Sequence, residues 1–226
     1  GSIIGIRSCG GGRRIQRREQ RPAAASGAFH RRTPEAEQDA VQQVLLTGLE
    51  KLEYRGYDSA GIFILDEANQ GHLFKEKGRI AELREVVDYT ISAHTGMGHT
   101  RWATHGVPSI KNAHPHQSAS GRFTLVHNGV IENYQELKNE NLSDTVLKGD
   151  TDSEIVVNVI EAFALAENLS TQEAFRAALK VIKGSYAFVL MDERSPEMIF
   201  AAKNKSPLLI GVGEDFHVVA SDAMAT

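Results

Sequence analysis

Cysteine is almost absent from this chain of 226 residues, which contains Cys9 alone. A single cysteine excludes an intramolecular disulfide, and such scarcity fits the reducing environment of the cytosol. No apolar run approaches the roughly 18 residues that a membrane span needs. We therefore expect a cytoplasmic protein with no membrane segment, and its composition, 41% hydrophobic and 24% charged, is that of an ordinary globular protein.

Acidic residues are nearly missing from the first part of the chain. Residues 1–34 contain eight arginines against Glu19 and carry a net charge of +7, so residues 35–226 carry −11 of the total of −4. An acidic body gives no reason to expect nucleic-acid binding. Residues 1–38 show no sustained apolar period, and we expect an atypical basic leader there that is disordered or derived from expression. A nucleic-acid arm or a transit peptide would have a similar composition.

The ordered domain is expected at residues 39–226, where both helical and strand periods occur. Apolar residues recur at helical spacing over 41–52, Asp152 begins a second helix, and Ser170 with Glu173 forms a capping box that opens a third, with Gly184 as its C-cap. Strands are predicted at residues 59–66, 97–100, 122–128, 186–192, 198–202, 208–212 and 216–221. Runs of strands with paired helices between them indicate an α+β fold in layers.

Two charged residues could hold the two ends of a free amino acid. Arg101 follows a short predicted strand, and a guanidinium group binds a carboxylate through two parallel hydrogen bonds. Asp152 stands at a predicted helix start and could hold an ammonium group. Taken singly, Arg101 could instead form a surface ion pair and Asp152 could simply be an N-cap.

The dipeptide Asn128-Gly129 has two interpretations as well. Asn-Gly is a strong turn signal, so one interpretation is a tight hairpin that ends the strand at residues 122–128. The other is an oxyanion hole, in which the Asn128 amide and the Gly129 N–H face a developing negative charge. One such donor contributes roughly 3–4 kcal/mol to transition-state stabilisation.

Six histidines lie between residues 94 and 127. They form no His-x-x-x-His helical pair, no thiolate joins them, and Gly and Pro interrupt the stretch. We expect hydrogen-bonded structural histidines, with one or two at a pocket rim, and no metal or cofactor. A metal-binding hydrolase built on these histidines is a third hypothesis.

Four motifs give the chain a family resemblance. They are Leu-Glu-Tyr-Arg-Gly-Tyr-Asp-Ser-Ala-Gly at 52–61, Thr-Arg-Trp-Ala-Thr-His-Gly at 100–106, Asn-Ala-His-Pro-His at 112–116 and His-Asn-Gly at 127–129. From about residue 39 to residue 223 the chain resembles the glutaminase domain, a type 2 glutamine amidotransferase, of the glutamine–fructose-6-phosphate aminotransferase family. The resemblance implies an N-terminal-nucleophile hydrolase fold, a four-layer α/β/β/α sandwich with two antiparallel sheets.

The resemblance also implies the site residues. Arg101 would bind the α-carboxylate of L-glutamine, Asp152 its α-amino group, and Asn128 with Gly129 would form the oxyanion hole. The other residues implied at the substrate are Trp102, Thr104, His105 and His114, the first three on a loop that closes over it.

The family's nucleophile is the main departure. In the family, the mature chain begins with Cys-Gly-Ile-Val-Gly; the thiolate attacks the glutamine amide, and the free α-amino group is the general base. Cys9 is the only cysteine here and would serve only if cleavage after Ser8 exposed it as the N-terminus. By spacing, the corresponding position lies near His30, and the first core strand is expected to be missing.

The implied function is hydrolysis of L-glutamine to glutamate and ammonia for glucosamine 6-phosphate synthesis from fructose 6-phosphate. The sugar would be used by an isomerase domain that residues 1–226 do not contain, and the parent enzyme would be a homodimer. The alternative is a catalytically silent module that binds glutamine or glutamate.

Overall fold

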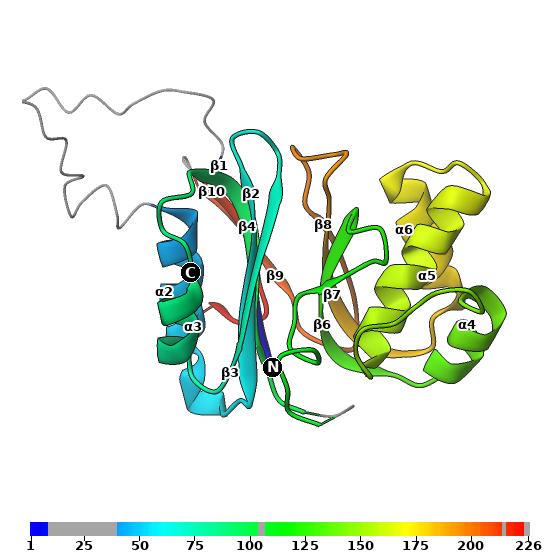
Figure 1. Ribbon diagram of the computed structural model, residues 1–226, viewed down its shortest axis with the longest axis horizontal. Helices are drawn as coiled ribbons and strands as arrows, with labels where there is room; N and C mark the ends of the chain where they lie inside the picture. Colours follow the sequence, from blue (N-terminus) through cyan, green and yellow to red (C-terminus); the bar gives the residue numbers. More distant parts are fainter. Residues whose placement is uncertain (9–39, 104–106, 214–215, 224–226) are drawn as a thin grey trace, which may run out of the picture.

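Two antiparallel sheets lie face to face between two layers of helices (Figure 1). The computed structural model describes residues 1–8, 40–103, 107–213 and 216–223. The four layers agree with the predicted α/β/β/α sandwich, and the α+β class is confirmed. Among the described residues, no helix combines the length and apolar character needed to cross a membrane.

The first sheet has six strands, and α2 and α3 cover its outer face (Figure 1). Its order is β3 (Gly71–Lys77), β2 (Ser59–Asp66), β4 (Ala93–Arg101), β1 (Ser2–Ser8), β10 (Phe216–Ala220) and β9 (Leu209–Val212). The covering elements are α2 (Val41–Lys51), the short 3-10 helix η1 (Glu53–Arg55) and α3 (Ile80–Val86).

The second sheet has four strands and is covered by the remaining helices (Figure 1). Its order is β5 (His116–Gln117), β6 (Phe123–Ile131), β7 (Gly184–Asp192) and β8 (Phe200–Asn204). The helices are α4 (Tyr134–Asn141), α5 (Asp152–Ala166) and α6 (Thr171–Val181). The apolar stripes of α5 and α6 pack on β6 and β7, which is the burial that their helical period predicts.

The prediction that residues 1–38 form a leader outside the fold is wrong for the segment Ser2–Ser8. These residues form β1, which pairs with β4 on one side and with β10 on the other. Successive side chains of a strand point to opposite faces, so Ile4 and Ile6 pack in the core under α2, while Ile3 packs between the two sheets. The first core strand is therefore present. Residues 9–39, which include Cys9 and His30, lie outside the described residues.

Other local predictions had mixed outcomes. The strand at residues 59–66 and the capping box are confirmed, since Ser170 Oγ accepts the Glu173 N–H (3.3 Å) and Glu173 Oε2 accepts the Ser170 N–H (2.9 Å). Gly184 is not a C-cap, because α6 ends at Val181 and Gly184 opens β7. The hairpin at Asn128-Gly129 is also wrong, because β6 continues to Ile131 in register with β7.

Candidate functional site

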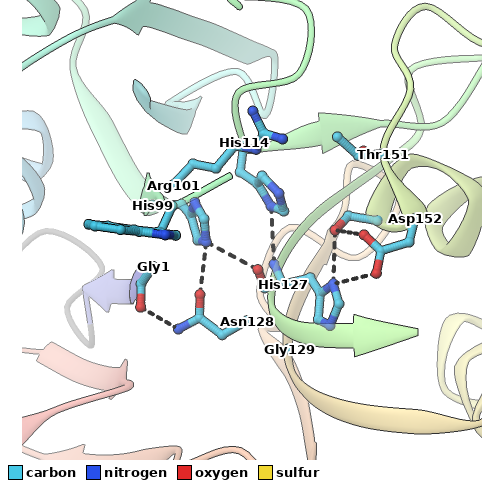
Figure 2. Close-up of a pocket in the computed structure, with 11 residues that line it drawn as sticks. Gly1, His99, Arg101, His114, His127, Asn128, Gly129, Thr151 and Asp152 are labelled. Atoms are coloured by element: carbon cyan, nitrogen blue, oxygen red, sulfur yellow. Dashed lines mark hydrogen bonds and ion pairs between the residues drawn. The ribbon is translucent and has the colours of Figure 1, made fainter. Parts of the chain in front are cut away.

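A small pocket opens where the two sheets meet the start of α5 (Figure 2). Its volume is about 190 Å³, below the roughly 300–1,000 Å³ of pockets for drug-sized ligands, so it suits a small metabolite. The lining residues come from the start of β1, the end of β4, the middle of β6, the start of α5 and two connecting segments. They are Gly1, His99, Arg101, Trp102, His114, His127, Asn128, Gly129, Thr151, Asp152 and Ser153.

Arg101 enters the pocket from the end of β4 and is only 3% exposed. Its Nη1 lies 3.5 Å from Asp58 Oδ1 and donates to the Val107 carbonyl at 3.4 Å. Asp58 also accepts the main-chain N–H of Ala103. Asp58 of the motif at residues 52–61 thus contacts both Arg101 and Ala103 of the motif that begins at residue 100. The alternative of a surface ion pair is wrong, because the guanidinium group is buried.

Asp152 is the first residue of α5 and is 3% exposed. The N-cap is Thr151, whose hydroxyl accepts the Glu154 N–H at 3.2 Å, so the alternative that Asp152 is the N-cap is wrong. Instead, Asp152 Oδ2 accepts the Ile131 N–H at the end of β6 (2.9 Å). Asp152 therefore stands in the first turn of α5, where the partial positive charge of a helix N-terminus is favourable to an acidic side chain.

Asn128 and Gly129 lie side by side in β6 and line the pocket (Figure 2). The Asn128 Nδ2 donates to the Gly1 carbonyl at 2.9 Å, and its Oδ1 lies 2.9 Å from His99 Nε2. Gly129 has φ of +127°, and a Cβ there would lie 2.1 Å from the Ser185 carbonyl oxygen. Only glycine fits this backbone without strain, so the pocket wall beside Asn128 is bare main chain.

Gly1 occupies the pocket at the start of β1 and brings no side chain to it. A Cβ there would lie 2.6 Å from the Thr100 carbonyl oxygen and 2.8 Å from Asn128 Oδ1. His30, near which the nucleophile position was expected, lies outside the described residues. Within the described residues, Gly1, directly before β1, lines the pocket. Within the described lining there is no cysteine.

Three buried histidines pack against one another at the pocket, and two of them, His99 and His114, line it. The rings of His99 and His114 stack with centroids 4.1 Å apart, and His116 meets His114 edge-on at 4.7 Å. Burial, the largest cause in each case, holds the pKa of all three well below the usual range. The three rings are therefore neutral near pH 7. Among the described residues, no set of three His, Cys, Asp or Glu side chains is arranged to hold a metal ion.

Most of the predicted site residues come together in one pocket, and the others lie outside the described residues. Arg101, Asp152, Asn128, Gly129 and His114 line one pocket, and the 59%-exposed Trp102 forms part of its lining beside Arg101. Thr104 and His105 lie outside the described residues, as does Cys9.

Five further lining residues were not predicted to belong to the site. His99 and His127 are isolated polar residues in buried strands, and Thr151 and Ser153 flank Asp152. The available signal for His127 was its place in the motif at residues 127–129, whereas alternation along the strand would put its side chain on the face opposite to that of Asn128. Gly1 could not be predicted as a pocket residue, because residues 1–38 were interpreted as a leader outside the ordered domain.

Comparison with known proteins gives one family and close relatives. The family described as "Glutamine amidotransferase domain" matches residues 99–225. Glutamine–fructose-6-phosphate aminotransferase (isomerizing) of Bacillus spizizenii is 67% identical over 186 residues, and those of Bacillus subtilis and Geobacillus kaustophilus are 66% and 61% identical over 186 and 185 residues. Each match covers 82% of this chain and 30% of the relative's length.

Solved structures share the fold at low sequence identity. Glutamine phosphoribosylpyrophosphate amidotransferase from B. subtilis superimposes with a TM-score of 0.73 at 23% identity, over 99% of this chain and 42% of that one. A structure described as the allosteric regulatory enzyme of purine biosynthesis gives 0.72 at 24% identity, with the same coverage. The four-layer sandwich is thus a fold that this chain shares with both solved structures.

Proposed function

Because this chain belongs to the family of glutamine amidotransferase domains, we propose that its pocket binds L-glutamine and that the enzyme to which it belongs hydrolyses glutamine to glutamate and ammonia. The ammonia aminates fructose 6-phosphate in the synthesis of glucosamine 6-phosphate, the activity that the names of the bacterial relatives indicate. Because the chain spans about 30% of those relatives, we assign the sugar substrate and the contacts of a homodimer to the remaining part. The absence of a disulfide pair fits a cytoplasmic location.

The observation that carries this proposal is the opposite charge of two buried side chains in one small pocket. Arg101 and Asp152 are each 3% exposed and both line it. A zwitterionic amino acid presents a carboxylate and an ammonium group on the same carbon, and a guanidinium with a carboxylate complements both. Arginine has five N–H donors, so its contacts with Asp58 and Val107 are compatible with a substrate carboxylate.

The side chain of such a ligand would extend toward Asn128 and Gly129. Its amide oxygen would take the place next to the Asn128 Nδ2, where an acceptor, the Gly1 carbonyl, lies now. As the carbonyl carbon is attacked, the charge on that oxygen grows, and a fixed amide donor stabilises it by roughly 3–4 kcal/mol. These residues thus supply binding and electrostatic stabilisation.

The described lining also favours a second candidate function. Covalent amide hydrolysis needs an activated nucleophile, for which the family resemblance implies a terminal thiol, and Gly1 brings no thiol to the pocket. In that case this chain binds glutamine or glutamate without hydrolysing it. Cys9 remains the only thiol in the sequence.

Calorimetric titration with L-glutamine and L-glutamate, together with an assay for ammonia release, separates the two candidates. Binding with ammonia release supports hydrolysis, and binding alone supports the silent module. We expect Arg101→Ala to weaken binding at least about tenfold, since hydrogen bonds to charged groups contribute roughly 1.5–3 kcal/mol each.

The matched control is Arg84→Ala. Arg84 pairs with Glu50 at 2.8 Å between the two outer helices, α2 and α3, away from the pocket, so its removal should leave binding unchanged. Equal glutamine affinity in Arg101→Ala and the unaltered chain would show that the pocket is assigned wrongly.

A further inference from the structure

His99 Nε2 lies between two oxygen atoms of β6 (Figure 2). One is Asn128 Oδ1 at 2.9 Å, and the other is the main-chain carbonyl oxygen of His127 at 3.1 Å. The ring is 2% exposed and is held by its stack on His114. It therefore joins β4 of one sheet to β6 of the other at the pocket.

The main-chain carbonyl decides which ring nitrogen carries hydrogen. A carbonyl oxygen only accepts hydrogen bonds, so a nitrogen 3.1 Å from it must donate. The His99 ring is then protonated at Nε2, and the side-chain atom of Asn128 that faces this N–H must be the acceptor oxygen.

That choice orients the whole Asn128 amide. Its oxygen and nitrogen occupy almost the same space, so an amide with no fixed partner can turn over and present either one. With Oδ1 held by His99, the NH₂ group faces Gly1, whose carbonyl accepts from it at 2.9 Å. The reversed amide would present a lone pair to that carbonyl and would repel a negative oxygen.

We propose that His99 is a positioning residue that locks the Asn128 amide with its NH₂ toward the pocket, so that it can bind the side-chain carbonyl of glutamine. This inference rests on the proposed function for the identity of the ligand. His99 acts on the ligand through Asn128, which it contacts at 2.9 Å.

The surroundings of the ring fit a donor that never changes its charge. Burial lowers the pKa of His99, so the ring stays neutral over the range in which an exposed histidine titrates. Protonation would add an N–H at Nδ1, which is buried and has no hydrogen-bond partner within the described part of the chain. The Nε2–H donor is thus present at every pH at which the fold is stable.

Two ligands distinguish positioning from a general structural role. L-Glutamine carries the zwitterion and the side-chain carbonyl, whereas L-norvaline carries the same zwitterion without the carbonyl. Removing one neutral hydrogen bond weakens binding by about three- to tenfold. We expect His99→Leu to weaken the binding of glutamine by that factor and to leave the binding of norvaline unchanged. We expect His99→Gln, whose amide N–H can replace Nε2–H, to retain glutamine affinity within about twofold.

A double-mutant cycle tests the coupling to Asn128. In an Asn128→Leu background, His99→Leu should cause no further loss of glutamine affinity, because the group that it positions is gone. An equal loss in both backgrounds, or a parallel loss of norvaline binding, would overturn the positioning role.

The ring itself gives a readout that needs no ligand. Nitrogen NMR of the unaltered chain should show His99 protonated at Nε2 and bare at Nδ1 from pH 8 to pH 5.5. The opposite tautomer, with Nε2 bare, overturns the inference whatever the ligand. Failure of the unaltered chain to bind glutamine while this tautomer is observed would instead count against the proposed function.

Discussion

At position 1 the main-chain carbonyl accepts a hydrogen bond from Asn128, and Gly1 itself has no side chain to place in the pocket. We predict that Gly1→Cys, produced so that the new cysteine is the first residue, gains glutamine hydrolysis of at least about 100-fold over the unaltered chain, because a thiol and a general base then meet the oxyanion donors. Ammonia release measures the gain. The main chain must withdraw slightly, since a Cβ now lies 2.6 Å from the Thr100 carbonyl oxygen.

Gly1→Ser is the matched control for this gain. It introduces the same Cβ with a weaker nucleophile, so it should remain well below Gly1→Cys. If the unaltered chain already hydrolyses glutamine as fast as Gly1→Cys, the attacking group lies elsewhere, and Cys9→Ser then shows whether it is Cys9.

The buried histidines make stability depend on pH. The pKa values of His99, His114 and His116 are lowered in the folded chain, mainly by burial. Above the unfolded value of about 6.5 both states are neutral. Below pH 6.5 these histidines bind protons in the unfolded chain but stay neutral in the folded chain. The free energy of unfolding therefore falls by up to about 1.4 kcal/mol per pH unit for each ring.

Urea unfolding at pH 7.5, 6.5 and 5.5 measures this dependence. The buried carboxylate of Asp192 acts in a lower window, because its pKa is lowered below 3.8 and its contribution is lost only in stronger acid. His116→Gln should reduce the fall in the free energy of unfolding between pH 6.5 and 5.5 by up to the contribution of one ring, about 1.4 kcal/mol per pH unit. An unchanged slope in that variant would show that His116 takes up protons in the folded chain.

At the residue scale, the charged and motif-bearing parts of the site were predictable from the sequence. Arg101, Asp152, Asn128 and Gly129 were expected together, and they line one pocket. His99 was not, because a polar residue buried in a strand has no periodic pattern; its importance depends on a neighbour in the other sheet that only the fold brings to 2.9 Å.

At the scale of elements, β2 and the segment that leads to β5 approach each other at Gly61. A Cβ at Gly61 would lie 2.2 Å from the His114 carbonyl oxygen and 3.0 Å from that of Phe74. Both are main-chain atoms, so neither can turn away. The glycine of the first motif therefore provides the room in which His114 reaches the pocket.

We predict that Gly61→Ala lowers the free energy of unfolding by about 1–3 kcal/mol, the usual cost of overpacking, and weakens glutamine binding by displacing His114. Gly211→Ala is the control, because a Cβ there lies 4.0 Å from its nearest atoms in an exposed part of β9. Denaturant unfolding of both variants measures the difference. A loss in Gly211→Ala as large as that in Gly61→Ala would rule out the close approach as the cause.

Most elements were predictable from their periods, although β3, α3, β5 and α4 were not predicted. Two of the wrong predictions have clear physical reasons. β1 is seven residues long and is followed by an arginine-rich segment, so its three isoleucines were too few to establish a strand pattern. Asn128-Gly129 has a strong turn signal, but cross-strand pairing overrode it: Asn128 pairs with Ala187 and Gly129 with Tyr186.

At the scale of the whole molecule, the first and last described strands are neighbours. β1 lies between β4 and β10, and the Ile3 N–H donates to Ser221 Oγ across 218 positions of the chain. The four-layer sandwich was expected from the family resemblance, but this closure was not, because β1 was interpreted as part of a leader. Strand order cannot be read from periodicity, since pairing partners this far apart leave no local pattern.

We predict that a chain ending at residue 213 loses cooperative unfolding, because β1 then has no partner on the side where Ile4 pairs with Ala220 and Ile6 with Val218. Hydrogen exchange at the β1 amides measures the loss of protection. A chain ending at residue 223 should keep it. Equal protection in the two chains would show that β4 alone holds β1.

This closure also sets an order of events during synthesis. The residues of β1 are translated well before those of β10. Almost the whole domain is therefore synthesised before β1 can pair with its second neighbouring strand. Contacts between distant positions form late because the intervening chain must first be brought together. Gly1, directly before β1, lines the pocket, so this wall of the pocket gains its full support only after β10 has been translated and paired with β1.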